Sequence, residues 1–339
     1  MKNVLLIIIA LLLALFCACQ VPEPFVGPMP SGEEQSSEGV MHEAEPQIFT
    51  IGGIDYELSV PAKTRINDYA EGNIEILTSS LTEPGTVIDL SGLSGCEYID
   101  TLVIKLNGES ENLIIPNLPS LSYCEIYGNS PASIDISAME SYNTLSLAEI
   151  IPEKIDIGAG PENIVLAEGF DIAKLAGAGN VKSVTVHGNA DLSKIADMGE
   201  VEKVYIFGKN DNVAELQNLE SLKRLSFHSF EGDLSGIGKL SMETLVFNSD
   251  ITQETLDTLA KSETVKELHL NDEFITNADF MEKLPNLETM ILSVNSSSSL
   301  EGIDEEQLEA LETNIPKEPL KEFIRKGGII YLNYDWGRT

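Results

Sequence analysis

The sequence is poor in basic residues, and this shortage excludes two kinds of partner. Lysine and arginine number 21 against 55 aspartates and glutamates in a chain of 339 residues, so the formal net charge is −34. Nucleic-acid phosphates and anionic lipid headgroups are bound by clustered lysine and arginine. We therefore expect no nucleic-acid partner and no polybasic membrane patch, and we interpret the acidity as a source of solubility.

The chain also lacks the motifs that carry common catalytic and metal-binding chemistry. It has no Gly-rich phosphate loop ending in Lys-Ser/Thr, no His-Glu-x-x-His and no Gly-x-Ser-x-Gly. The acidic surface allows diffuse Ca²⁺ binding, but no loop has EF-hand spacing. Only four cysteines are present, and Cys96 and Cys124 have no histidine nearby that would suggest zinc. The sequence therefore predicts no enzyme, no cofactor and no metal site.

Residues 1–18 have the features of a signal peptide. Residues 4–16 are almost uninterruptedly apolar, which is too short a run for a membrane span. The following Phe-Cys-Ala-Cys, residues 16–19, resembles the bacterial lipobox, in which a small residue precedes the cysteine that is lipidated. Cys19 fits because Ala18 precedes it, whereas the family prefers leucine where this chain has Phe16. The resemblance implies an extracytoplasmic protein, anchored to the bacterial cell membrane through a lipid alone; the alternative is ordinary secretion with cleavage nearby.

Composition divides the rest of the chain into four parts. Residues 19–47 are rich in Pro, Glu, Ser and Gly, and we expect a disordered tether. Residues 48–80 alternate in polarity around Gly52 and Gly53, which predicts a β-hairpin within an N-terminal cap. We assign residues 81–298 to repeats and residues 299–339 to a C-terminal cap.

A short pattern, apolar-x-apolar, recurs ten times at spacings of 19 to 23 residues. An earlier pair, Ile74/Ile76, is less regular. The ten pairs are Leu102/Ile104, Cys124/Ile126, Leu145/Leu147, Ile164/Leu166, Val184/Val186, Val204/Ile206, Leu225/Phe227, Leu245/Phe247, Leu268/Leu270 and Met290/Leu292.

Residues 284–295, LPNLETMILSVN, look like the signature of a leucine-rich repeat. The resemblance covers about residues 74–295 and is to bacterial leucine-rich-repeat surface lipoproteins. It implies an α/β fold: a leucine-rich-repeat solenoid with a parallel β-sheet on its concave face, short and mostly non-helical returns, and caps at both ends. Asn107, Asn129 and Asn189 lie five residues after the first strand position, but other residue types fill this slot in several repeats, so a regular asparagine ladder is not expected. Those residues are Gly169, Lys209, Phe230, Asp250 and Glu273.

Further elements follow from the same pattern. Residues 252–260 and 319–326 have helical spacing or boundary signals, and residues 329–332 are typical of a strand. Cys124 occupies an inward slot and Cys96 lies on an apolar ladder, so we expect both as small core residues.

The repeat register also assigns residues to the concave face, because side chains alternate along a strand. Three columns result: Ser183, Lys203, Arg224, Thr244, Glu267 and Thr289; Thr185, Tyr205, Ser226, Val246, His269 and Ile291; His187, Phe207, His228, Asn248, Asn271 and Ser293. Aromatic and arginine side chains dominate binding hot spots. We predict a ligand-binding face made of Lys203, Tyr205, Phe207, Arg224 and His228, with His187 and His269 beside it.

Two properties of this face can be anticipated. His187 and His228 lie two strands apart, about 10 Å at normal strand spacing, which is too far to share a metal ion. The histidines also leave open a pH-dependent interaction.

The function that we expect is a cell-surface interaction module that binds a protein or glycan, acts without catalysis and is a monomer. One alternative is a structural envelope lipoprotein without a dedicated ligand. Another is a hydrolase that uses dispersed carboxylates, which the columns disfavour because Glu267 is their one acidic residue.

Overall fold

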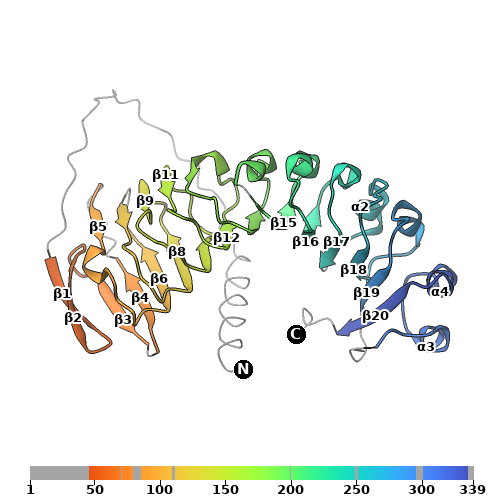
Figure 1. Ribbon diagram of the computed structural model, residues 1–339, viewed down its shortest axis with the longest axis horizontal. Helices are drawn as coiled ribbons and strands as arrows, with labels where there is room; N and C mark the ends of the chain where they lie inside the picture. The colour runs from red at the N-terminus through yellow and green to blue at the C-terminus, as the bar shows by residue number, and fades with distance from the viewer. Residues whose placement is uncertain are drawn as a thin grey trace, which may run out of the picture. The chain divides into compact units, whose positions relative to one another are not determined.

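The computed structural model describes residues 46–69, 71–78, 85–108, 111–198, 200–248, 251–294 and 301–334. The predicted signal peptide, Cys19 and nearly all of the predicted tether lie outside these ranges. The described protein is an α/β protein, with two mostly parallel sheets of many strands and few helices (Figure 1).

The larger sheet has 13 strands, and its order follows the sequence from β3 to β20, with the strands of the smaller sheet interspersed along the chain. All neighbours pair in parallel except β3 and β4. The strands are β3 (Arg65–Asp68), β4 (Asn73–Leu77), β6 (Thr101–Leu106), β8 (Tyr123–Gly128), β10 (Thr144–Leu147), β12 (Asn163–Leu166), β14 (Ser183–His187), β15 (Lys203–Lys209), β16 (Arg224–Glu231), β17 (Thr244–Asn248), β18 (Glu267–Asn271), β19 (Thr289–Val294) and β20 (Ile329–Tyr334).

The predicted parallel sheet and its register are confirmed. Each of the ten apolar pairs lies in a strand of this sheet, and every member is at most 2% exposed. Ile74 and Ile76 belong to the same ladder, because β4 pairs in parallel with β6 and places them opposite Leu102 and Ile104. Each strand therefore buries its apolar side chains against those of the neighbouring repeats, which a single repeat could not do.

A second sheet combines the predicted N-terminal hairpin with segments between the first strands of the larger sheet, which the sequence did not predict as strands. It has seven strands, parallel from β5 onward. They are β1 (Pro46–Ile51), β2 (Ile54–Ser59), β5 (Val87–Asp89), β7 (Asn112–Ile114), β9 (Ser133–Asp135), β11 (Lys154–Asp156) and β13 (Leu175–Ala176). Ile88, Leu113, Ile134 and Ile155 occupy equivalent positions along it and are buried. In this part of the chain, both sheets therefore contribute to one core.

Later returns use short helices in place of strands. These are the 3₁₀ helices η3 (Leu192–Met198), η4 (Val213–Asn218), η5 (Ser235–Lys239) and η6 (Asp279–Lys283), and the helix α2 (Gln253–Asp257), which begins after Thr252. Two further 3₁₀ helices, η1 (Ser91–Leu93) and η2 (Ile172–Lys174), lie in earlier returns that also contain a strand of the second sheet. An aspartate commonly starts such a return by accepting a hydrogen bond from the N–H two residues later, as Asp191 and Asp233 do. The helix expected at residues 252–260 is thus present but shorter.

Both ends of the described chain contribute strands to the edges of the sheets. The strands β1 and β2 form the antiparallel hairpin predicted around Gly52 and Gly53, which both have positive φ. At the other end, α3 (Glu305–Ala310), which was not predicted, and α4 (Lys317–Arg325) precede β20, which pairs in parallel with β19. Cys96 and Cys124 are free and buried, as expected of core residues.

One asparagine position differs from the prediction. Asn189 occupies the expected slot on its repeat but is exposed. Asn210, one residue later in the next repeat, is fully buried, and its Nδ2 donates to the carbonyl of Ala190 at 3.2 Å. A fixed count of five residues from the first strand position does not reach Asn210, because β15 is longer than the neighbouring strand β14.

Candidate functional site

The predicted binding face lies on the solvent side of the 13-stranded sheet, on β14 to β18. The register aligns His187 with Phe207 and Phe207 with His228, and it aligns Lys203 with Arg224. His269 lies on β18, two strands beyond β16. The structure therefore brings six of the seven predicted residues together on three adjacent strands, with His269 near their edge.

Three rings of this face form a continuous stack across the strands. The ring of Phe207 stacks on His228, with 4.1 Å between centroids and an angle of 10°, and on His187 at 4.9 Å and 19°. A phenyl ring thus stands between the two imidazoles. Tyr205 approaches His228 in a tilted arrangement at 6.3 Å. We call His187, Phe207 and His228 the ring stack.

Two cations lie beside each other at the start of the same strands. Lys203 is exposed and Arg224 is half-buried, and they are direct partners in the parallel register. The Nε of Arg224 donates to Ser226 Oγ at 3.4 Å, which holds the guanidinium over the sheet. No carboxylate lies within 4.0 Å of either cation in the part of the chain that the structure describes.

The expectation that all three columns are exposed was wrong at four positions. Ser226 and Val246 are 0% and 1% exposed, and Ser183 and Asn271 are also buried. Ser226 and Val246 lie in the middle column between the larger Tyr205 and His269. Tyr205 and Phe207 are themselves half-buried, since large neighbours cover part of each ring. The accessible face is therefore smaller than the columns suggested.

The histidines of the face are neutral at pH 7. Burial lowers the pKa of His228 to about 4, with smaller contributions from His187 and the positive charge of Arg224. Burial also lowers the pKa of His187, although Glu168 opposes the shift. His269 hydrogen-bonds Glu267 at 2.7 Å, yet burial outweighs this contact and lowers its pKa. We therefore interpret the His269–Glu267 contact as a hydrogen bond, and any titration of this face falls in the acidic range.

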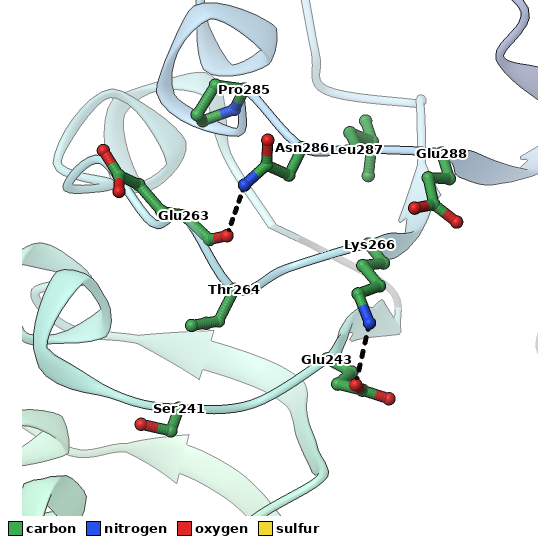
Figure 2. Close-up of a pocket in the computed structure, with 9 residues that line it drawn as sticks. All are labelled: Ser241, Glu243, Glu263, Thr264, Lys266, Pro285, Asn286, Leu287 and Glu288. Carbon is green, nitrogen blue, oxygen red and sulfur yellow. Dashed lines mark hydrogen bonds and ion pairs between the residues drawn. The ribbon is translucent and has the colours of Figure 1, made fainter.

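A hollow of about 590 Å³ lies elsewhere, on the segments that lead into β17, β18 and β19. Figure 2 shows Lys266 directed at Glu243 and the Asn286 amide directed at the backbone carbonyl of Glu263. These contacts measure 2.9 and 2.7 Å. The lysine and the amide that line the hollow thus already bond to the protein, and we do not choose it as the binding site.

Three residues that line the hollow, Glu243, Lys266 and Glu288, belong to a row of alternating charges that the sequence analysis missed. From β12 to β19, the residue immediately before each strand of the larger sheet is, in order, Glu162, Lys182, Glu202, Lys223, Glu243, Lys266 and Glu288. Ion pairs join Lys223 to Glu202 at 2.7 Å and Lys266 to Glu243 at 2.9 Å. We call these residues the charge row; it was detectable in the sequence once the repeat register was known.

No cluster of three or more His, Cys, Asp or Glu that could hold a metal ion occurs among the residues described. Within the same ranges, no helix is both long and apolar enough to cross a membrane. No model of a known protein family matches the chain, and no curated protein is detectably similar to it.

Proposed function

We propose that this protein is a leucine-rich-repeat solenoid, held outside a bacterial cell by a lipid on Cys19, that binds a protein or glycan partner on one sheet face. The repeat pattern and the parallel stack of strands support the solenoid. The anchor depends on the resemblance of residues 16–19 to a lipobox. The binding role is non-catalytic and needs no cofactor.

The observation that carries the binding role is the ring stack together with the adjacent cations. Aromatic and arginine side chains supply most of the energy in binding hot spots. Here three rings and two cations gather on three neighbouring strands of a strongly acidic protein. A surface that served solubility alone has no need of this grouping, since partly exposed rings do little for solubility.

The test is capture of a partner by the full-length chain from cell-surface extracts, compared with the variants Phe207→Ala and Tyr205→Ala. We expect both variants to lose the partner while circular dichroism and melting temperature show a folded protein. Tyr127→Ala is the matched control, because Tyr127 is a half-buried aromatic residue on the same sheet at β8. A partner retained equally by all variants would place binding elsewhere.

A further inference from the structure

We propose that Lys203 and Arg224 form an anion-binding subsite, which receives a carboxylate from an acidic peptide segment of a protein partner. This inference rests on the binding function proposed above and specifies its partner. It requires that the two cations be held together, that no carboxylate of the protein pair with either of them, and that the neighbouring surface suit a peptide.

The fold holds the two cations together against their mutual repulsion. They are register partners on adjacent parallel strands, so their Cα atoms are separated by about 4.8 Å. Like charges directly opposite on a sheet are destabilising. Of the other members of this column, Ser183, Thr244 and Thr289 are uncharged, and Glu267 on β18 is an acid two strands beyond Arg224. The repulsion is therefore local, and a bound anion relieves it.

No carboxylate in the described ranges lies within ion-pair distance of either cation, although Glu202 interacts with Lys203 electrostatically at longer range. Lys223, the residue next to Arg224, pairs with Glu202 at 2.7 Å, whereas Arg224 pairs with no acid in the described ranges. The contact from its Nε to Ser226 occupies one of five guanidinium donors. The other donors suit a carboxylate, because guanidinium and carboxylate match in bidentate geometry. Lys203 adds a second charge beside it.

The ring stack favours a peptide over a sugar. Sugars pack their C–H groups against the electron-rich faces of aromatic rings. Both faces of Phe207 are covered by imidazoles at 4.9 and 4.1 Å, so the ring offers its edge. The stack lies four residues along the strand from the cations, about 13 Å at strand rise. A peptide with an acidic side chain and an apolar side chain at that separation fits both.

The overall charge of the protein does not prevent such a complex. A net charge of −34 repels an acidic partner at long range. However, the Debye length is about 8 Å at physiological ionic strength, so distant charges are screened. The closest charges then decide the interaction: Lys203 and Arg224 form the subsite itself, whereas Glu267 lies two strands beyond Arg224 and bonds to His269.

The experiment uses a blocked, fluorescent pentapeptide in which three glycines separate a glutamate from a phenylalanine. Its counterpart has glutamine for glutamate. In fluorescence anisotropy with the full-length chain, we expect the glutamate peptide to bind on the order of tenfold more tightly, because charge-assisted hydrogen bonds are about twice as strong as neutral ones. The double variant Lys203→Ala/Arg224→Ala should bind both peptides equally. Lys105→Ala, a cation on the same face at β6, should keep the preference.

A second readout follows His228 by NMR. Burial is the main reason for its low pKa, but Arg224 also lowers it. A carboxylate bound at Arg224 should raise the pKa of His228, whereas the glutamine peptide should leave it unchanged. A shift of this kind shows that the anion lies close to Arg224.

Three results would overturn the subsite: equal affinity for the two peptides, no binding of either at millimolar concentration, or a preference that survives the double variant. Stronger binding of dextran sulfate than of the glutamate peptide, lost in the same variant, would overturn the assignment to a peptide. A partner that is lost with Phe207→Ala but kept by the double variant would leave the proposed function intact and remove the subsite.

Discussion

Asn210 offers the sharpest test of how the repeats are held together. It is fully buried between two successive returns, where its Nδ2 donates to the carbonyls of Gly188 and Ala190 at 3.4 and 3.2 Å. Its Oδ1 accepts from the N–H of Asn212 at 2.9 Å. One side chain therefore bonds backbone groups of two neighbouring repeats, and Asn210→Ala removes all three contacts.

The expected cost follows from these bonds. Leaving a buried polar group without a partner costs about 1–3 kcal/mol. The bond to Gly188 is long and contributes little, so the bonds to Ala190 and Asn212 decide the result. We expect Asn210→Ala to lower the free energy of unfolding by about 2–4 kcal/mol. Asn210→Asp keeps the acceptor but loses both donors and buries a charge, so it should destabilise at least as strongly.

Asn189→Ala is the matched control, because Asn189 is exposed at the slot where counting placed the ladder asparagine. Its effect should stay within about 0.5 kcal/mol, as for surface substitutions generally. Urea unfolding followed by circular dichroism measures both variants, with equal m-values as the condition for comparison. If Asn210→Ala is no more destabilising than Asn189→Ala, then the buried hydrogen bonds do not stabilise the stack and our reasoning is wrong.

Three other predictions concern the core, the face and the charge row. Phe227→Ala should cost about 3–5 kcal/mol in urea unfolding, because the buried ring packs against two others and leaves a cavity; a cost below 1 kcal/mol would contradict this packing. His228 has a folded pKa of about 4 against an ordinary 6.5, so the unfolded chain binds its proton first and stability should fall as pH drops from 6.5 towards 4; His228→Gln should flatten that slope, and an unchanged slope would refute the assignment. Lys223→Glu should destabilise more than Lys223→Gln at low salt, because it places three carboxylates in succession, and the difference should shrink in high salt if the row acts electrostatically.

The sequence predicted the larger sheet well because its signal is both periodic and buried. Alternation within each strand fixes which side chains face the core, and a one-residue slip would expose them all. Ten such pairs, repeated in phase, therefore determined the register as well as the strands. The same register places His187, Phe207 and His228 in one column, and the structure stacks their rings.

The second sheet was harder to predict because its strands are only two or three residues long beyond the hairpin. Segments such as Ser133–Asp135 contain one buried residue each, which is too little alternation to distinguish a strand from a turn. Their hydrogen bonds come from neighbouring repeats, for example from Ile136 to Asp156, and local sequence does not show them. The burial of Ser226 and Val246 has a similar origin, since it depends on the size of side chains on adjacent strands.

The charge row and the predicted binding face differ in how they place like charges. Immediately before the strands, the chain alternates sign over seven successive positions, so no two like charges are neighbours in that row. One residue later, Lys203 and Arg224 break this separation by lying side by side. Simple avoidance of repulsion does not explain the pair, because Ser183, Thr244 and Thr289 hold uncharged positions in this column and its one other charged residue, Glu267, lies two strands beyond Arg224. A sequence that separates like charges at one position and joins them at the next is the pattern expected when the joined pair has an anionic partner outside the chain.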